Sequence, residues 1–318
     1  IGLPLTLLKR EPSHEMGVLE LGMSSAGEIK RLAEIAQPDI GVITNISEGH
    51  LVQLKSLKDI QSAKGELFNA LTEESTAIVN ADDPLVLELA RSLRAKTVTF
   101  GIDQPADVRA SEIENKDNLG FKFKVNLFDK TLSVRLPYLG YCNIYNALAA
   151  LATGYSLGIK EDAMTRGLEN YQRMSQRNEK IQHKEIDLIN DSYNANPRSM
   201  TEALKTLDSF KTQGRRIFVI GDMLELGDLS ITAHQKLGEE IAASQTSILI
   251  SVGKLASLSA KSAQALAGEK IQILELASHQ EAAEFLTQEA VSGDCVMFKG
   301  SRGAAMEKVL QIFMESKN

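Results

Sequence analysis

The stretch that decides the fold runs from Val18 to Glu66 and contains two short apolar runs. They are Val18-Leu19-Glu20-Leu21-Gly22-Met23 and Gly41-Val42-Ile43-Thr44-Asn45. Short apolar runs that close on a polar residue predict parallel strands buried on both faces of a sheet. In open α/β sheets, ligands bind beyond the carboxyl ends of such strands.

Three chemically distinct side chains lie near these expected strand ends. Glu20 is at or near the end of the first run, His50 follows the second run by a short loop, and Lys64 lies on the next helix, within Ala63-Lys64-Gly65-Glu66. We therefore expect a carboxylate, an imidazole and an amine to converge at one edge of the sheet, where a metal–phosphate site would be built.

The composition is that of an ordinary globular protein. The chain has 318 residues, enough for two domains, with 43% hydrophobic and 24% charged residues. A formal net charge of −7 argues against a general nucleic-acid or anionic-membrane binder. We expect no membrane insertion, because no apolar run approaches the roughly 20 residues of a membrane span. Cys142 and Cys295 are far apart and lack metal-ligand spacing, which predicts a reducing cytoplasm without disulfides.

Up to about residue 101, strand and helix patterns alternate, which implies a parallel sheet. Three later segments alternate between apolar and polar residues, so we expect a small antiparallel sheet appended to the parallel one. The expected elements are strands at Val18–Met23, Ile40–Asn45, Thr76–Asn80, Thr97–Phe100, Val108–Ile113, Gly120–Leu127 and Leu132–Leu136, and helices at Ile29–Ala36, Ser56 to about Leu71, Leu85–Leu93, Asn143–Leu157 and Glu161–Asn170.

The polar, unpatterned segment Tyr171–Glu179 predicts a boundary between a domain of residues 1–174 and a domain of residues 175–318. The second half alternates again and predicts a compact Rossmann-like α/β domain. Its expected elements are strands at Ile186–Ile189, Arg216–Ile220, Ser247–Val252, Gln272–Leu276 and Cys295–Phe298, and helices at Met200–Phe210, His234–Ala243, Leu255–Leu266, Glu281–Ala290 and Ala305–Glu315.

Taken singly, Glu20, His50 and Lys64 would be ordinary surface residues. Magnesium needs oxygen ligands, usually one or two carboxylates plus phosphate oxygens, and Glu20 fits that role directly. Histidine is a less usual magnesium ligand, so the role of His50 stays open. The Lys64 ammonium would repel a metal, and it would help only by contacting phosphate or by being converted to an anion.

Each of the other candidate residues has both a functional and a purely structural interpretation. Arg177, in the linker, is either solvated or reaches a nucleotide held between the domains. Asn143 is either the N-cap of its helix or, with Asn146, a reader of an adenine edge. Cys142 is either a reactive thiol or a small packing residue.

Two loops after expected strands are further candidates. Asp191-Ser192-Tyr193-Asn194-Ala195-Asn196-Pro197 is either an ordinary turn or a ligand loop. Lys299-Gly300-Ser301-Arg302 is either a solvated connection or a carboxylate or phosphate grip, made by two cations and the amides at a helix start.

Taken together, these motifs resemble the Mur ligases over essentially the whole chain. The central-domain pattern includes Leu19–Met23, Ala63–Glu66, Asn80-Ala81-Asp82-Asp83-Pro84 and Asn143–Ala150. Asp191–Pro197, Gly221-Asp222-Met223-Leu224-Glu225-Leu226-Gly227 and Lys299–Arg302 narrow the resemblance to the members that add D-alanyl-D-alanine to a UDP-N-acetylmuramoyl-tripeptide.

The resemblance implies an α/β protein with a central ATPase-like domain and a C-terminal Rossmann-like domain. It implies an ATP- and Mg²⁺-dependent peptide ligase of peptidoglycan precursor synthesis, acting in the cytoplasm as a monomer and without a nucleic-acid partner. ATP would phosphorylate the carboxylate ending the tripeptide, and the amine of D-alanyl-D-alanine would then displace phosphate from the acyl phosphate.

The resemblance also assigns roles to single residues. Glu20 and His50 would bind magnesium, and Lys64 looks like the carbamylated lysine of the family. Asn146, with Asn143, would contact adenine, while Arg177 and Asp191 would hold the ribose and phosphates. The residues nearest the incoming dipeptide would be Asn194, Asn196, Lys299, Ser301 and Arg302.

Departures from the family pattern lead to a specific expectation. The phosphate-binding loop Gly-x-x-x-x-Gly-Lys-Thr and the domain that grips UDP do not occur, and Cys142 stands where the pattern usually has His. Because the chain opens at Ile1 without methionine, we interpret it as an N-terminally truncated piece and expect weak ATP binding and little or no turnover. The rival interpretations are another amide ligase of the same superfamily, such as a folylpolyglutamate type, and a non-catalytic binding module.

Overall fold

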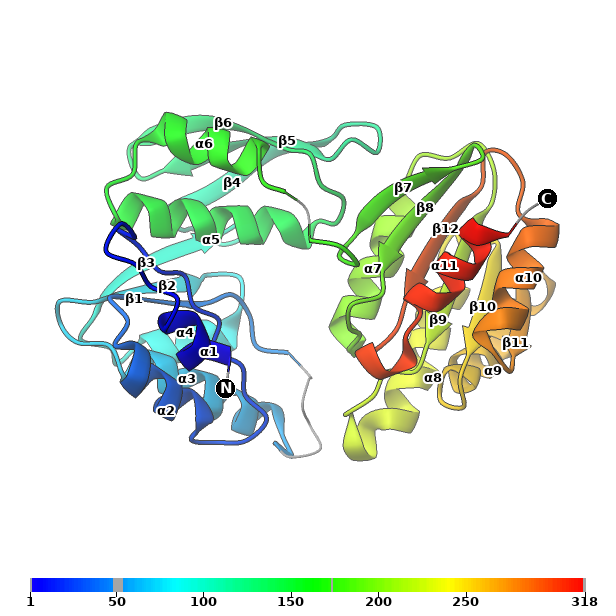
Figure 1. The fold of residues 1–318 in the computed structure, drawn as a ribbon, viewed down its shortest axis with the longest axis horizontal. Coiled ribbons are helices and arrows are strands. Elements are labelled where there is room, and N and C mark those ends of the chain that lie inside the picture. The colour runs from blue at the N-terminus through cyan, green and yellow to red at the C-terminus, as the bar shows by residue number, and fades with distance from the viewer. Residues whose placement is uncertain (1, 48–53, 173, 317–318) are drawn as a thin grey trace. The chain divides into compact units, whose positions relative to one another are not determined.

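The computed structural model describes all residues except 1, 48–53, 173 and 317–318 (Figure 1). The chain divides into two compact units. The first consists of Ile1–Ile113, Phe123–Val134 and Ile144–Leu168, and the second of Glu114–Lys122, Arg135–Asn143 and Glu169–Asn318. Among the described residues, the strands form two six-stranded sheets.

The strands of the first sheet lie in sequence order, from β1 to β6. They are β1 (Ile40–Ile43), β2 (Thr76–Asn80), β3 (Lys96–Gly101), β4 (Val108–Asn115), β5 (Phe121–Leu127) and β6 (Lys130–Leu136). The strands β1 to β4 pair in parallel. β5 and β6 are joined by two residues, a connection short enough only for antiparallel neighbours. The predicted strands after residue 101 are thus present, and they continue the parallel sheet.

Burial explains why these segments are strands. Ala77 to Asn80 of β2 are all buried, as expected for a parallel strand covered on both faces. In β5, buried and exposed residues alternate at every position, so only one face of this strand is covered.

The strand predicted over Val18–Met23 is wrong, because residues 18–23 form no regular secondary structure. Val18 is 96% exposed, whereas Met23 lies in the apolar cluster with Ile29 and Ile60. An apolar run becomes a strand only where a neighbour supplies backbone hydrogen-bond partners. In the part of the chain that the structure describes, β1 pairs with β2 alone. Glu20 therefore lies on an exposed irregular segment and not at a strand end.

Local capping sets the starts of several helices in the first unit. The Ser56 side chain caps α3 by accepting from the Asp59 amide at 3.1 Å, and Asp83 caps α4. Gly27, at the N-cap of α2, has no side chain, and the Glu66 carboxylate of α3 accepts from the Gly27 and Lys30 amides instead. The helices are α1 (Gly2–Leu7), α2 (Glu28–Ala36), α3 (Leu57–Asn69), α4 (Pro84–Ala90), α5 (Cys142–Ser156) and α6 (Glu161–Glu169).

The second sheet has the strand order β11-β10-β9-β12-β8-β7. Only β7 runs antiparallel to its neighbour. The strands are β7 (Glu179–His183), β8 (Ile186–Asp191), β9 (Arg216–Gly221), β10 (Ile248–Val252), β11 (Gln272–Leu276) and β12 (Cys295–Lys299). The sequence pattern did not predict β7, whereas the other five strands match their predicted positions closely.

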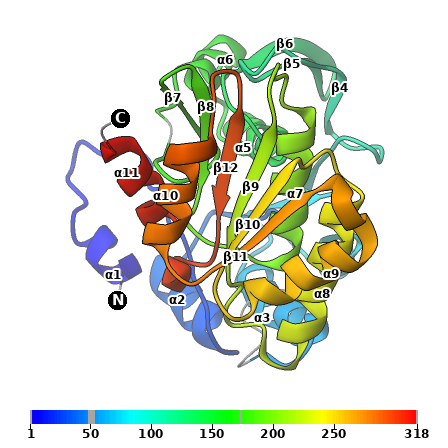
Figure 2. The same ribbon diagram turned by 90° about the vertical axis from the view of Figure 1, so that its right-hand side faces the viewer.

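Helices cover both faces of the second sheet (Figure 2). One face packs against α7 (Pro197–Ser209), α8 (Ser230–Ala242) and α9 (Ala256–Ala267), and the other against α10 (His279–Glu289) and α11 (Glu307–Glu315). Alternate residues of β9 enter the two cores: Phe218 and Ile220 the first, Ile217 and Val219 the second. Short 3₁₀ turns η1 (Gly227–Leu229), η2 (Gly268–Lys270) and η3 (Arg302–Ala304) complete the unit.

Candidate functional site

Three loops meet at one end of the second sheet, and we call this end the carboxyl edge. They are the loops of residues 192–196, 222–226 and 300–302, which follow β8, β9 and β12. Since β12 lies between β8 and β9, these loops are neighbours. The chain leaves β12 towards α11 on one face, but leaves β8 and β9 towards α7 and α8 on the other face. Such a switch point is where open α/β sheets bind ligands.

An ion pair between a buried lysine and a partly buried aspartate joins the carboxyl ends of β8 and β12. Lys299 and Asp191 are register partners at the ends of their strands, and the Lys299 Nζ donates to the Asp191 Oδ2 at 2.6 Å. The same Nζ donates to the main-chain carbonyls of Asn194 at 3.1 Å and Asp191 at 3.4 Å. Lys299 is only 2% exposed, so its ammonium is directed inward.

Ser301 joins all three loops. Its hydroxyl donates to the Ala195 carbonyl at 3.1 Å and accepts from the Leu224 amide at 2.8 Å. Its amide donates to the carbonyl of Asp222 at 3.0 Å. The Asp222 carboxylate in turn accepts from the amides of Leu255 and Ala256, at the start of α9. A carboxylate there is favoured by the helix dipole.

Two glycines at this edge are closely packed. A Cβ built on Gly221 would lie 2.6 Å from the Met306 sulfur, and one on Gly300 would lie 2.6 Å from the Met306 Cγ. A Cβ on Gly300 would also lie 3.2 Å from the Gly221 Cα, so a side chain at either position would force its neighbours to shift.

The two asparagines predicted to lie near the dipeptide have local roles. The Asn196 Oδ1 accepts from the Ser199 amide at 2.9 Å, and the Ser199 hydroxyl accepts from the Asn196 amide, which makes a capping box for α7. The Asn194 Oδ1 accepts from the Ala195 amide at 2.9 Å. The loop is thus fixed by its own side chains as well as by β12.

Arg177 is presented by a tight turn. Its neighbours Gln176 and Asn178 both have positive φ, at 65° and 47°, an unusual conformation for residues other than glycine. The Asn178 amide donates to the Asp191 Oδ1 at 3.1 Å. The Arg177 guanidinium carbon lies 4.1 Å from the centre of the Tyr193 ring, a cation–π arrangement.

Arg302 approaches the same turn from β12. Its Nη1 donates to the Gln176 Oε1 at 2.8 Å and to the Glu307 Oε1 at 3.2 Å. The Arg302 side chain is 62% exposed, in contrast to Lys299. The carboxyl edge therefore combines one buried cation with two arginines nearer the surface.

The triad predicted in the first unit is described only in part. His50 lies outside the described residues. Glu20 is exposed, and the Lys64 Nζ donates to the Asn45 carbonyl at 2.7 Å, just beyond β1. Within the described residues, no three His, Cys, Asp or Glu side chains gather as a metal site. The meeting of Glu20, His50 and Lys64 stays a prediction.

Two acidic residues organise the loops after β1, β2 and β3. The Asp83 carboxylate accepts from the Ile46 amide at 2.8 Å and caps α4. The Asp82 carboxylate accepts from three consecutive amides, of Ile102, Asp103 and Gln104, and from the Tyr145 hydroxyl. Burial acts to raise the Asp82 pKa, but these hydrogen bonds outweigh it and hold the pKa below its usual value.

The start of α5 carries the predicted adenine readers. The Asn143 Nδ2 donates to the Leu139 carbonyl at 2.6 Å, and Asn146 is exposed one helical turn later. Cys142 precedes them, and burial, with a smaller contribution from the Asp191 carboxylate, raises the pKa of its thiol to about 11. A thiol that stays protonated at neutral pH is a poor nucleophile, which favours the packing interpretation.

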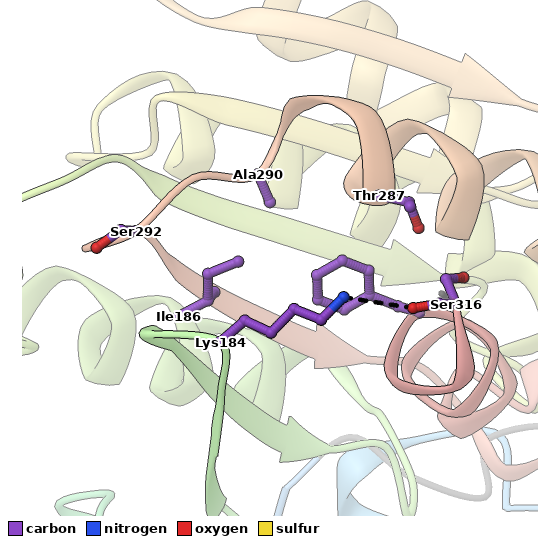
Figure 3. Close-up of a pocket in the computed structure, with 7 residues that line it drawn as sticks. Lys184, Ile186, Thr287, Ala290, Ser292 and Ser316 are labelled. Carbon is purple, nitrogen blue, oxygen red and sulfur yellow. Dashed lines mark hydrogen bonds between the residues drawn. The ribbon is translucent and has the colours of Figure 1, made fainter. Parts of the chain in front are cut away.

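A small cavity lies at the opposite end of the second sheet (Figure 3). Its volume is about 140 Å³, and it is lined by Lys184, Ile186, Thr287, Ala290, Ser292, Phe313 and Ser316. The Lys184 Nζ donates across it to the Ser316 carbonyl at 3.4 Å. Its position at the amino ends of β8 and β12 separates it from the carboxyl edge.

Sequence reasoning gave no role to several residues that build this edge. Asp222 lies in the Gly221–Gly227 motif. That motif contributed to the family resemblance, but none of its residues was assigned a role. His234 is fully buried; its Nε2 accepts from the Met223 amide at 3.0 Å, and burial lowers its pKa. Tyr193, whose ring supports Arg177, was signalled only by its place in the loop after β8.

Comparison with known proteins places the chain in a family. Residues 1–154 match the Mur ligase middle domain, and residues 173–302 match the Mur ligase, glutamate ligase domain. The UDP-N-acetylmuramoyl-tripeptide–D-alanyl-D-alanine ligase of Bacillus subtilis (strain 168) is 35% identical over 317 residues, covering 99% of this chain and 68% of the relative. The chain belongs to the Mur ligase family.

Solved structures of Mur ligases agree with the fold. Crystal structure I of MurF from Acinetobacter baumannii has a TM-score of 0.89 and 31% identity, over 99% of this chain and 68% of that one. The structure of MurF from Thermotoga maritima in complex with ADP has a TM-score of 0.85 and 27% identity. The match covers 99% of this chain and 70% of that one. The predicted α/β fold and the predicted family are therefore confirmed. Among the described residues, no helix is both long and apolar enough to cross a membrane.

Proposed function

We propose that this Mur ligase joins D-alanyl-D-alanine to UDP-N-acetylmuramoyl-tripeptide at the expense of ATP, in peptidoglycan precursor synthesis. The observation that carries the proposal is 35% identity, over 99% of the chain, to a Bacillus subtilis protein that is named for this reaction. The same name belongs to the Escherichia coli (strain K12) relative, which is 34% identical over 319 residues.

The proposed reaction has two steps. A carboxylate oxygen of the tripeptide attacks the γ-phosphorus of ATP, forming an acyl phosphate and releasing ADP. The amine of D-alanyl-D-alanine then attacks the acyl carbon, the carbon–oxygen bond to phosphate breaks, and the amine gives up its proton as phosphate leaves. Several anions meet in the first step, so fixed cations and hydrogen-bond donors carry much of the catalysis.

We assign the nucleotide and the dipeptide to the predicted residues. Arg177 and Asp191 serve the ribose and phosphates, and Asn143 and Asn146 serve adenine. Asn194, Asn196, Lys299, Ser301 and Arg302 form the surroundings of the dipeptide. What supports this assignment is that most of these residues lie at the carboxyl edge, the usual ligand position in such sheets.

The metal proposal concerns Glu20, His50 and Lys64. Magnesium is usually held by one or two carboxylates plus phosphate oxygens, so Glu20 alone is an adequate protein carboxylate, and the ion would neutralise phosphate charge. Lys64 fits the metal only after carbamylation, because its ammonium is a cation that donates to Asn45. Intact-mass measurement in bicarbonate buffer tests for the added CO₂.

We further propose a cytoplasmic location and a boundary between domains at residues 174 and 175. The location is supported by ATP and a UDP-linked substrate, and by Cys142 and Cys295, which form no disulfide. The boundary is supported by the positions of the two domain matches. Because the sequence contains no Gly-x-x-x-x-Gly-Lys-Thr loop, we also propose that this chain binds ATP weakly and turns over slowly.

The deciding assay incubates the protein with ATP, Mg²⁺, UDP-N-acetylmuramoyl-tripeptide and D-alanyl-D-alanine, and follows phosphate release and product mass. We expect the product of the complete gene to release phosphate only when the dipeptide is present. Normal turnover by this 318-residue chain would refute the proposed weak activity but would leave the proposed reaction unaffected. Turnover only with another amine, such as glutamate, would instead indicate a different amide ligase, and binding without turnover a non-catalytic module.

A further inference from the structure

The Lys299 ammonium has no capacity left for a substrate. A lysine has three N–H donors and no acceptor. Three oxygens surround the Lys299 Nζ: the Asp191 Oδ2 at 2.6 Å, the Asn194 carbonyl at 3.1 Å and the Asp191 carbonyl at 3.4 Å. With a side chain 3% exposed, Lys299 could reach a dipeptide or a phosphate only by giving up one of these bonds.

The bonds of Lys299 lead to the groups that do face outward. The other oxygen of its partner, the Asp191 Oδ1, accepts from the Asn178 amide at 3.1 Å. Asn178 closes the turn that carries Arg177, and the Tyr193 amide donates to the Gln176 carbonyl at 3.1 Å, which ties that turn to the loop after β8. Asp191 is therefore held on one side by Lys299 and on the other by the Arg177 turn.

Charge explains why this arrangement is needed. The positive φ values of Gln176 and Asn178 are sparsely populated, so this turn persists only if its surroundings hold it. A buried carboxylate without a cation would be strongly disfavoured, and a buried cation likewise. Because Lys299 neutralises Asp191, the carboxylate can stay at the strand end, where it accepts a hydrogen bond from the Asn178 amide.

We propose that Lys299 is a positioning residue of the ligase reaction, which acts through Asp191 to fix Arg177 and the loop after β8, and does not itself contact substrate. This inference rests on the proposed function. It differs from the direct dipeptide contact that the motif alone suggests for Lys299.

A double-mutant cycle in the complete ligase tests this, with Lys299→Met, Asp191→Asn and the double variant. If Lys299 acts through Asp191, kcat/KM for ATP falls about tenfold or more in each single variant, and the double variant is no worse than the poorer single one. Losses that multiply in the double variant would mean that Lys299 contacts substrate independently, and would overturn the proposal.

A matched control separates positioning from general destabilisation. Arg215 and Asp294 form another ion pair of this sheet, with the Arg215 Nη2 2.7 Å from the Asp294 Oδ2, at the amino ends of β9 and β12. We expect Arg215→Met to lower thermal stability but to leave kcat/KM unchanged well below its melting temperature. An equal fall in kcat/KM would show that losing any such pair suffices, and would also overturn the proposal.

Hydrogen exchange gives a readout that needs no substrate. In Lys299→Met, peptides covering residues 176–178 and 191–196 should exchange faster, while peptides from α9 should not; unchanged exchange would contradict the proposed bonds. If Lys299→Met does not fold, Lys299→Gln, which keeps two donors, replaces it in every comparison. Failure of the parent enzyme to ligate these substrates would refute the proposed function, and the exchange data would still decide the positioning role.

Discussion

Replacing Ser301 by alanine should destabilise the second unit by about 2–3 kcal/mol. Ser301 is only 3% exposed, and its hydroxyl bonds the Ala195 carbonyl and the Leu224 amide. A buried polar group left without a partner costs about 1–3 kcal/mol. Ala195 is 5% exposed and bears this cost in full, whereas Leu224 is 39% exposed, so water can replace part of its lost bond. The change removes one oxygen, so the cavity contribution is small.

Unfolding of the second unit measures this effect. At about 3 °C per kcal/mol for a domain of this size, the midpoint should fall by roughly 6–9 °C. Because two units can unfold separately, hydrogen exchange of peptides from β8 and β9 in increasing urea assigns the loss to the second unit. Ser257→Ala is the control, since the Ser257 hydroxyl makes one exposed bond to the Lys254 carbonyl. A loss below about 0.5 kcal/mol for Ser301→Ala, equal to the control, would refute the reasoning.

Three further predictions concern single side chains. Asn196→Ala should cost the second unit about 1 kcal/mol, as loss of an N-cap usually does, and Asn196→Asp should restore most of it; urea unfolding measures both. Asp82 has a lowered pKa in the folded protein, so its stabilising effect is present above its unfolded pKa of about 3.9 and is lost as pH falls through the folded pKa. The destabilisation caused by Asp82→Asn should therefore shrink in acid, as unfolding measured between neutral and acidic pH will show. With a thiol pKa of about 11, Cys142 should react with a maleimide far more slowly at pH 7 than a free cysteine does, and unfolding in urea should remove the difference.

The parts of the fold that could be predicted from sequence are those with a strong local signal. β9 and β12 are apolar apart from Arg216 and Lys299 and buried apart from Arg216, and their length and bounding turns identify them. β7 lacks such a signal: Glu179 to His183 is mostly polar, and the strand forms because a two-residue turn folds it back onto β8. Lys184 and Glu185 in that turn both have positive φ, which a sequence without glycine or asparagine there does not suggest.

The segment Val18–Met23 is the reverse case, because a local strand signal is present but no strand forms. Its local pattern is that of a buried strand, but strand formation depends on a pairing partner that the pattern does not contain. In the described residues, Leu21 and Met23 contribute to the core as an irregular segment packed beside α2 and α3. The local pattern therefore predicts burial correctly at Met23 and in part at Leu21, but wrongly at Val18, which is 96% exposed, and it predicts the backbone hydrogen bonding incorrectly.

In the candidate site, a sequence motif likewise indicates a location without indicating the role of each of its residues. Lys299 and Arg302 are both cations within four residues, and no local feature separates the buried one from the exposed one. The distinction comes from register: Lys299 ends β12 directly opposite Asp191, a pairing across 108 residues. Arg302 comes after Gly300 and Ser301, beyond the end of β12, and its side chain is 62% exposed. An anion site needs cations whose positions are fixed, and a neutral buried pair can fix them without weakening the positive field of the arginines nearer solvent. A charged motif can therefore contain both residues that bind a ligand and residues that hold the binding residues in place. Here, long-range strand pairing is what distinguishes the two kinds.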